Sequence, residues 1–531
     1  MEQDPDVIVI GGGPSGTMLA LELAAQGTAF RIIDRAHQRS SMSRALIIQP
    51  RSFEVMNRHG DARKLYEKGN VTSGPMAWLD DKLALDFDIT KVANYRDSQF
   101  GLPCLLSQAD TEAYLDECLK EKYGCKVEWG IEATSVVQDA DGVSVTLRNI
   151  VNGNEETIRV KYVVGADGAH SVVRKSSKNI TFKGDTYPQE FLMCDMTVEN
   201  FKFPWNRYHL ILATGLLALF PMPGGWIRMM ASREKSSNGA SPTFDEVDAV
   251  FHKILPNGGD ITNTTWITNF RLHHRVVNSY RDGRLLLIGD AAHIHSPVGG
   301  QGLNTGIQDA LNLGWKLARV VRGYRLECFL DTFDEERRPV GQNLLSKTDK
   351  AFKLFTMTNP MAIYLRSWII PWFAPYIVSR GNLELLYGFV SQFAVNYRNS
   401  TAVRSGAGFN GPVMGGDRAP DGEVDVDGDT KRLHRILAPE SHNLVLFSGT
   451  LRTGSELAIM ERAAARFEAR NPDKARVHMV VHERGRKNMY SHRLHGDYGF
   501  SSPGYVYIRP DGYVAMIGHL EEIDELSDWL K

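Results

Sequence analysis

The sequence has few cysteines, almost no net charge and no long uninterrupted apolar segment. Its 531 residues include only five cysteines, none in CxxC spacing, which argues against a zinc ribbon or a dithiol redox pair and favours reduced thiols. Lys and Arg number 61 and Asp and Glu 63, a formal net charge of −2, so nothing electrostatic indicates nucleic acid or acidic membranes as partners. We therefore expect neither nucleic-acid binding nor a metal site.

We also expect neither a targeting segment nor a membrane-spanning one. The N-terminal sequence MEQDPDVIVIGGG has acidic residues where a secretory signal needs basic ones. The most apolar stretch, AIYLRSWIIPWFAPYIV from Ala362, contains Arg366 and two prolines and falls short of the ~20 uninterrupted apolar residues of a spanning helix. We expect a cytoplasmic protein without a transmembrane segment, in which this stretch is a packed helix or the surface of a possible homodimer.

What the sequence does contain is the pattern of a dinucleotide-binding unit. DVIVI predicts a buried strand, and Gly11, Gly13 and Gly16 follow in GxGxxG spacing before a helix that ends at Gly27. The first glycine allows a tight turn, the second lets the backbone approach a pyrophosphate, and the third lets helix and strand pack closely. The next strand, AFRIID, ends at Asp34, whose carboxylate can accept hydrogen bonds from ribose hydroxyls. The pattern predicts an adenine dinucleotide.

A second glycine-rich segment, GDAAHIHSPVGGQGLNTGIQDALNLGWKL at 289–317, follows the apolar run RLLLIG. From Leu303 onward the apolar residues recur on one helical face, which predicts a helix that begins near Gly302. Its N-terminus presents unsatisfied N–H groups and a partial positive charge, worth ~0.3–2 kcal/mol to an anion, and the preceding glycines leave room for a flat group. This segment is predicted to hold an electron-rich cofactor ring.

The fingerprint alone does not distinguish NAD from FAD. Together with YVVGADGAHSVVR at 162–174 and the segment from 289, it resembles, in order and spacing, the three signatures of the flavoprotein aromatic hydroxylases, the family of para-hydroxybenzoate hydroxylase and phenol hydroxylase. The resemblance covers nearly the whole chain. It implies FAD, NADPH or NADH as a transient co-substrate, and hydroxylation of a phenolic or polycyclic aromatic compound, such as a secondary metabolite, by O2 through a flavin 4a-hydroperoxide.

The resemblance also implies which residues contact the cofactor. Asp34 would bind the adenosine ribose, Arg44 would lie beside the flavin and the phosphates, and Gln108 would touch the ribityl chain. Asp290 would hold the ribitol hydroxyls, and residues 297–304 would run along the flavin ring. The remaining implied contacts are Gly11, Gly13, Pro14, Ser15 and Gly16 of the fingerprint, Arg35 beside it, Asp167, His170 and Arg174 of the second signature, and Pro297, Gly300, Gln301, Gly302, Leu303 and Asn304.

Substrate activation should need a base or a cation. Forming a phenolate at pH 7 from a phenol with a pKa of about 10 costs roughly 4 kcal/mol. By resemblance to the substrate strands of para-hydroxybenzoate hydroxylase, His209 takes the place of a substrate-deprotonating tyrosine and Arg228 that of an arginine supporting the flavin. Met222 stands where that enzyme grips a carboxylate, which implies a more apolar pocket. The implied catalytic residues are Tyr208, His209, Arg228 and Pro297, although Tyr208 and His209 could instead form an ordinary strand edge.

The expected fold class is α/β: a Rossmann-like FAD-binding domain of the para-hydroxybenzoate hydroxylase type, a β-sheet substrate domain and a C-terminal domain. From Leu444 a strand, a helix, a strand, a hairpin and a final helix resemble the thioredoxin-like domain of phenol hydroxylase relatives, but no cysteine follows Cys328, so no redox role is expected there. The expected boundaries are 1–74, 103–185 and 282–345 for FAD binding, 75–102 and 186–281 for the substrate domain, 346–404 for a helical region and 405–531 for the thioredoxin-like domain.

Three other functions stay open at this point. The same fold supports Baeyer-Villiger oxygen insertion into a polyketide ketone, which the structure of the product would reveal. A flavin-dependent reductase would turn over without oxygen, whereas a monooxygenase needs it. A flavin-bearing binding protein would show NADPH oxidation that no aromatic compound accelerates.

Overall fold

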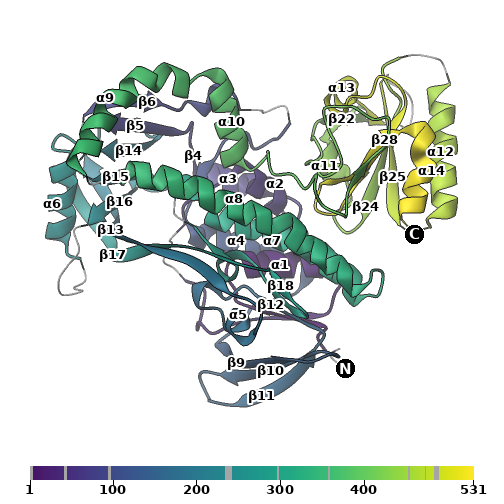
Figure 1. Ribbon diagram of the computed structural model, residues 1–531, viewed down its shortest axis with the longest axis horizontal. Helices are drawn as coiled ribbons and strands as arrows, with labels where there is room; N and C mark the ends of the chain where they lie inside the picture. Colours follow the sequence, from purple (N-terminus) through teal and green to yellow (C-terminus); the bar gives the residue numbers. More distant parts are fainter. Residues whose placement is uncertain are drawn as a thin grey trace.

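The computed structural model describes residues 4–40, 45–79, 81–93, 97–213, 215–233, 242–295, 298–356, 359–451, 455–472, 474–482 and 489–530. The chain forms three regions (Figure 1): a sheet built largely on the N-terminal strands in the centre, an eight-stranded sheet with helices on both sides at the left, and a C-terminal region at the right. The long helix α8 (Asp331–Phe355) runs across the molecule between them. None of the described helices is both long enough and apolar enough to cross a lipid bilayer.

The first region confirms the predicted βαβ unit. β1 (Val7–Ile10) is fully buried and pairs in parallel with β2 (Phe30–Asp34) and β12 (Tyr162–Gly165). A strand buried on both faces reads as a continuous apolar run, as VIVI does. α1 (Pro14–Ala25) connects β1 to β2 and packs against α7 (Gly302–Val321). In the described chain this sheet has the order β18-β19-β12-β1-β2-β8, with β8 at Glu128–Trp129, β18 at Arg281–Asp282 and β19 at Leu285–Leu287.

The second region is a sheet of order β20-β17-β13-β16-β15-β14-β5-β6 among the described residues. Its strands are β5 (Pro75–Leu79), β6 (Lys82–Asp86), β13 (Phe182–Glu199), β14 (Tyr208–Leu212), β15 (Leu216–Pro221), β16 (Ile227–Arg233), β17 (Asp260–Val277) and β20 (His293–Ile294). β14 lies between β15 and β5, so Tyr208 and His209 stand on an inner strand of the sheet and not at its edge.

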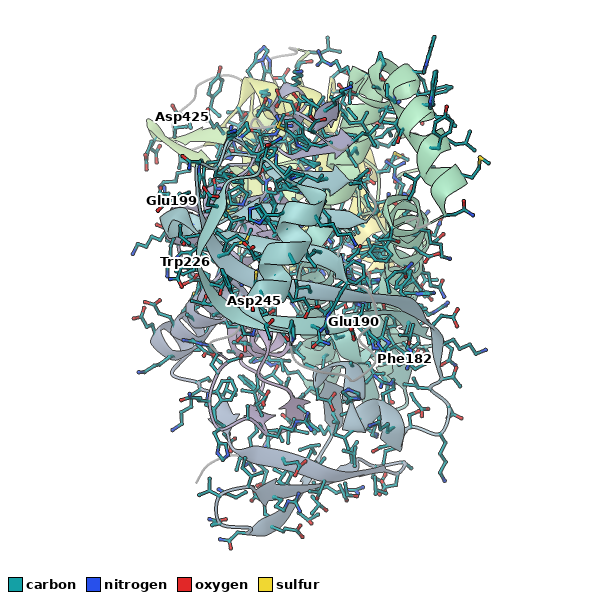
Figure 2. The ribbon with its side chains drawn as sticks, turned by 90° about the vertical axis from the view of Figure 1, so that its left-hand side faces the viewer. Phe182, Glu190, Glu199, Trp226, Asp245 and Asp425 are labelled. Carbon is teal, nitrogen blue, oxygen red and sulfur yellow. The ribbon has the colours of Figure 1, made fainter. Side chains whose placement is uncertain are left out.

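This sheet buries both of its faces because successive side chains of a strand point to opposite sides. Ile211, Leu217 and Met229 pack with α6 (Phe244–Ile254), and we call this side the α6 face. Leu212 and Ala218 point the other way and pack with residues of α8 and α9 (Pro360–Ile377), which defines the α9 face. Figure 2 shows α6, with Asp245 in its first turn, lying across one side of the sheet, and β13 running from Phe182 to Glu199.

The C-terminal region contains the predicted order of strand, helix, strand, hairpin and helix: β24 (His442–Phe447), α12 (Glu456–Arg470), β25 (Ala475–Val481), the pair β27 (Gly504–Ile508) and β28 (Val514–His519), and α14 (Ile523–Trp529). Its likeness to thioredoxin stays a prediction. The sequence did not predict the flanking strands β21 (Arg404–Ser405), β22 (Glu423–Val426), β23 (Asp429–Arg432) and β26 (Met489–Tyr490), or the helices α11 (Leu433–Ile436) and α13 (His492–Tyr498).

Shorter elements complete the described chain. The remaining strands are β3 (Ile47–Ile48), β4 (Asn70–Val71), β7 (Cys104–Leu105), β9 (Ile131–Gln138), β10 (Val143–Asn149) and β11 (Glu155–Val160). The remaining α-helices are α2 (Pro50–Met56), α3 (Ala62–Lys68), α4 (Gln108–Tyr123), α5 (Val172–Ser176) and α10 (Arg380–Ser391). The 3-10 turns are η1 (Ile89–Lys91), η2 (Gly168–His170), η3 (Pro223–Gly225), η4 (Gly289–Ala291), η5 (Val298–Gly300), η6 (Glu327–Leu330) and η7 (Leu520–Glu522).

Buried ion pairs fix the C-terminal region to the first region. Arg509 contacts Glu336 of α8 at 2.7 Å, and Lys316 of α7 contacts the same carboxylate at 2.7 Å. Arg418 contacts Glu54 of α2 at 2.7 Å; burial opposes ionisation of Glu54, but its arginine partners hold its pKa at about 2. Removing one partner of such a pair typically costs about 3–5 kcal/mol. The C-terminal region is therefore firmly attached to the rest of the molecule, and its ion pairs hold the C-terminal half of α7 in place.

Candidate active site

The fingerprint glycines meet the three requirements that the sequence implied. An added Cβ at Gly11, whose φ is +113°, would lie 2.3 Å from the carbonyl oxygen of Ala166, and one at Gly16 would lie 1.9 Å from that of Gly11. The Cβ position of Gly13 has no atom within 4 Å, and no side chain caps the start of α1 at this residue. The uncapped N–H groups at the start of the helix therefore fit a pyrophosphate.

Asp34 is fixed at the end of β2 by its own neighbours. Its Oδ2 accepts a hydrogen bond from the N–H of Gly12 at 2.8 Å, and its Oδ1 accepts one from the N–H of Ala36 at 2.8 Å. Each carboxylate oxygen has a further lone pair, so the group can still accept from ribose hydroxyls. Arg35 is exposed beside it. This donor and acceptor set fits the adenosine end of FAD.

Three distant segments meet at the start of α1. Ser15 Oγ occupies the space beside Gly289 and Gly306, at 2.5 Å and 2.2 Å from the Cβ positions that side chains there would take. Gly289 also has a φ of +58°, which favours glycine. The contact brings the turn that carries Asp290 against both helix α1 and helix α7. Asp290 itself is exposed.

Arg174 of the second signature contacts the turn that contains Asp290. Arg174 is buried, donates to the carbonyl oxygens of Ala291 at 2.8 Å and Ala169 at 2.7 Å, and lies 4.0 Å above the ring of Phe182. Its guanidinium thus positions the turn that contains Asp290. The cofactor contact that the resemblance implies for Arg174 stays a prediction.

Asp167, the acidic residue of the second signature, has one carboxylate oxygen that is available to a ligand. Asp167 Oδ2 accepts from the N–H of Val172 at 2.6 Å, whereas its buried Oδ1 has no hydrogen-bond partner among the described residues. Burial raises the pKa of Asp167. A hydroxyl group of a bound cofactor could donate a hydrogen bond to Oδ1 and so satisfy this oxygen. His170 is exposed on the same turn.

The helix that carries the last signature begins as predicted, at Gly302. Asn304 turns inward, where its Oδ1 accepts from the N–H of Gln49 at 2.8 Å and its Nδ2 donates to the carbonyl of Ile47 at 2.8 Å. Gln301 likewise accepts from Gln392 at 2.7 Å. These two side chains brace the loop. Their own cofactor contacts stay predictions.

The backbone of this loop is open where a flat ring would lie. The Cβ position of Gly302 has no atom within 4 Å, and Gly300, with a φ of +61°, packs against Ile47. Leu303 packs against the core of the first region. Gln108 lies at the start of α4 and accepts from the N–H of Ala45 at 3.2 Å. The predicted contacts Arg44 and Pro297 lie outside the described residues.

Sequence reasoning missed a buried polar chain beneath the loop. His295 Nε2 lies 2.7 Å from His293 Nδ1, His293 Nε2 lies 2.6 Å from Asp309 Oδ2, and Arg337 donates to Asp309 Oδ1 at 2.7 Å. Burial opposes ionisation of Asp309, but Arg337 and His293 outweigh it and hold its pKa at about 2. The available signal was Asp309 itself, a charged residue on the buried and mostly apolar side of α7.

Comparison with known proteins identifies what this site belongs to. The family model described as FAD binding domain matches residues 4–348. The chain is 36% identical, over 67% of its length and 63% of the relative, to 6-methylpretetramide 4-monooxygenase of Streptomyces rimosus. It is 31% identical to pentachlorophenol 4-monooxygenase of Sphingobium chlorophenolicum, over 79% of this chain and 76% of that one. The chain belongs to this FAD-binding family of aromatic monooxygenases.

A solved structure agrees with this assignment across the whole molecule. CabE, an aromatic hydroxylase from angucycline biosynthesis, is 26% identical with a TM-score of 0.75, covering 97% of this chain and 96% of CabE. The implied family, the FAD cofactor and the class of enzyme, an FAD-dependent aromatic monooxygenase, are thereby confirmed.

In the monooxygenase, the two residues expected nearest the substrate point to opposite sides of β14. Tyr208 lies on the α9 face, stacked on Phe220 with ring centroids 5.5 Å apart. His209 lies on the α6 face, fully buried, with its ring 4.9 Å from that of Phe203 and its Nε2 3.1 Å from the carbonyl of Pro204. The α9 face also contains Ile47, which packs against Gly300 of the cofactor loop, so only Tyr208 shares that side.

The implied role of His209 as the base therefore does not fit the structure of the monooxygenase. Burial among apolar neighbours lowers the pKa of His209 to about 4. Taking a proton from a phenol of pKa about 10 with such a base would cost about 8 kcal/mol. The alignment of the substrate strands therefore did not predict the side of the sheet on which His209 lies.

Arg228 of the monooxygenase lies on the α9 face, as its implied role requires. It is buried and donates twice to Asp195, directly opposite on β13, with both distances 2.7 Å, and its guanidinium lies 5.0 Å from the ring of Trp266. Met222 is buried on the same face. The α9 face thus combines an apolar wall with Tyr208 and the Arg228–Asp195 pair.

Two cavities of the monooxygenase lie away from these residues. One of about 960 Å³ borders Trp315 and Arg319, near the C-terminal end of α7, and Tyr507 of the C-terminal region. Another of about 100 Å³ borders Arg51 and Glu54 of α2. Neither touches the fingerprint, the loop at 298–304 or β14, so neither marks the aromatic site.

Proposed function

We propose that this FAD-dependent monooxygenase uses NADPH or NADH and O2 to hydroxylate a phenolic or polycyclic aromatic compound that lacks a carboxylate beside Met222. The observation that carries the proposal is the α9 face, where Leu212, Ala218, Phe220 and Met222 form an apolar wall on the same side as the cofactor loop. Relatives named for 6-methylpretetramide and for pentachlorophenol support a flat aromatic substrate.

The residues of the fingerprint and of the α7 loop hold the cofactor. The N–H groups beside Gly13 would bind its pyrophosphate, Asp34 its adenosine ribose, and the start of α7 at Gly302 the electron-rich end of its ring. When bound, FAD supplies the reaction with the nicotinamide and with dioxygen that side chains do not provide. Arg174 and Ser15 keep the turn with Asp290 in place for this purpose.

The α9 face binds and orients the substrate. A flat ring lying on the wall of Phe220 and Met222 displaces water from the reacting side. Burial raises the pKa of Tyr208, so its hydroxyl stays protonated and donates a hydrogen bond to the phenolic oxygen. This donation favours the phenolate and offsets part of the roughly 4 kcal/mol that its formation costs at pH 7. Arg228, held by Asp195, supports the cofactor side of the same space.

Purified protein with FAD tests the proposal. NADPH and NADH oxidation should be measured with simple phenols, polycyclic phenols and their carboxylated analogues, and the products analysed by mass spectrometry under 18O2. We expect a polycyclic or apolar phenol to accelerate oxidation and to gain one oxygen atom from O2, with the carboxylated analogues weaker. A lactone or ester product would assign ring-oxygen insertion instead. Oxidation that no aromatic compound accelerates, or a product without label, would contradict the proposal.

A further inference from the structure

The outer side of α9 is an exposed apolar surface. Eight large apolar side chains between residues 361 and 376 are each between 50% and 79% exposed. Among them Tyr364, Trp368, Trp372 and Tyr376 recur every four residues, which places them on one side of a helix, with Phe373 beside them. Figure 1 shows α9 at the edge of the molecule opposite the C-terminal region. We call this surface the outer face of α9.

The opposite side of α9 is already buried. Ile370 belongs to the core of the α9 face, and Ala374 and Ile377 pack against it. The helix is therefore apolar all round, which is typical of helices that are covered on every side. Contiguous apolar surfaces larger than a few hundred Å² on a folded protein mark an interaction site. The outer face of α9 thus needs a partner.

Charge narrows the choice of partner. Arg366 is the only charged residue in the sequence from 360 to 377, and its side chain lies outside the described ones. The nearest charged residues along the chain on either side are neutralised within their own helices, Lys353 by Asp349 at 2.8 Å and Arg380 by Glu384 at 3.0 Å. A helix that lies on an anionic membrane carries several basic residues along its polar side, whereas the sequence of α9 contains one. An identical uncharged surface suits it better.

The area of the outer face of α9 also favours a second copy of the chain as the partner. Aromatic side chains bury about 150–250 Å² each, so the eight exposed residues offer on the order of 900 Å² per copy. A standard protein interface buries about 800 Å² per partner. We propose that two copies of this chain pair through the outer face of α9 about a two-fold axis, with Trp368 and Trp372 at the centre. Pairing would also hold α9 over the face on which the proposed function places the substrate.

The test uses the full chain loaded with FAD and compares two matched double variants. Trp368→Glu/Trp372→Glu places charges at residues that are 58% and 79% exposed, and Tyr324→Glu/Leu326→Glu does so at residues that are 63% and 78% exposed outside α9. Sedimentation velocity over serial dilution should show a wild-type dimer that persists at about 1 M salt, because apolar contacts are not screened. The tryptophan variant should raise the dimer dissociation constant about 30-fold or more, while the control stays a dimer.

Thermal melting and the flavin absorption spectrum check that both variants are folded, independently of any activity with aromatic compounds. A wild-type protein that stays monomeric at every concentration would overturn the proposal, as would a folded tryptophan variant that dimerises like the wild type. Flotation with phosphatidylcholine vesicles distinguishes the other partner. A monomer that floats with the vesicles, and stops floating when Trp368 and Trp372 are changed, would assign the outer face of α9 to a membrane and refute the dimer.

Discussion

The α9 face and the α6 face of the eight-stranded sheet are built from alternate residues of the same strands, yet they carry different chemistry. On β14, Tyr208 faces the side of the cofactor loop whereas His209 faces the closed core under α6. On β16, Arg228 pairs with Asp195 on the α9 face, whereas Arg233 pairs with Glu246 of α6 at 2.6 Å. Because strand side chains alternate, an error of one residue in an alignment exchanges a reacting group for a structural one.

Truncating the core of the α6 face should give the largest effect on stability. Phe251 of α6 is fully buried in that core. Changing Phe251 to Ala should lower the free energy of unfolding by about 3–5 kcal/mol, through lost burial and the cavity it leaves. Urea titration of the FAD-loaded protein measures this, and the KM for the aromatic substrate should be unchanged.

Phe220 to Ala is the matching change on the α9 face. Phe220 stacks on Tyr208, so its loss should raise the KM for the aromatic substrate about tenfold or more, in addition to a loss of stability. A substrate KM that responds equally to both phenylalanine variants would show that the two faces are not separated as the structure indicates.

The histidine of the α6 face should make stability depend on pH. The folded pKa of His209 is about 4, below the ordinary value of about 6.5 for an unfolded histidine. Between these two pKa values the histidine binds a proton in the unfolded state but not in the folded state. The contribution of His209 to the free energy of unfolding is therefore complete above pH 6.5 and is lost as the pH falls towards 4. The loss should reach about 2 kcal/mol by pH 5. His209→Phe should lose correspondingly less stability between pH 7 and pH 5 in urea titrations. Parallel pH profiles for the two proteins would contradict the assignment.

Most of the cofactor site was predictable because its signals are local. The strand before Gly11, the acid at Asp34 and the start of α7 at Gly302 all follow from residue spacing within one βαβ unit or one helix. The order of elements after residue 444 was also predictable, from alternating and helical apolar patterns.

The rest depends on contacts between distant residues. The side of the sheet that His209 occupies is set by how β14 pairs with β15 and β5, which no short pattern encodes. The pair between Asp309 and Arg337 joins α7 to α8, and Arg174 reaches a carbonyl more than a hundred residues away. Side chains such as Asn304 matched a cofactor motif but are used to brace the loop. Spacing identifies motifs, whereas burial and pairing decide what each side chain does.

Variants of the two arginines of β16 compare the α9 face with the α6 face through their effects on enzyme activity. Arg228→Gln removes a positive charge beside the cofactor side of the α9 face and should lower kcat/KM about 100-fold, a loss typical of a polar group aimed at developing charge. Arg233→Gln breaks the pairs with Glu246 and Glu190 on the α6 side and should lower stability by about 1–3 kcal/mol with kcat/KM within about twofold. Steady-state kinetics and urea titration of both variants check this; a larger kinetic loss for Arg233→Gln would reverse the assignment.

The smallest effect should come from one hydroxyl group on the α9 face. Tyr208→Phe keeps the stack on Phe220 but removes the donor that we place on the phenolic oxygen of the substrate. A hydrogen bond of this kind contributes about 1 kcal/mol, so kcat should fall about five- to tenfold while the KM changes little. The yield of hydroxylated product per NADPH should fall too, because a less activated ring competes less well with unproductive oxidation. His209→Phe is the control one residue away and should leave both kcat and this yield unchanged. If the His209 variant lost product yield while the Tyr208 variant kept it, the substrate would lie on the α6 face.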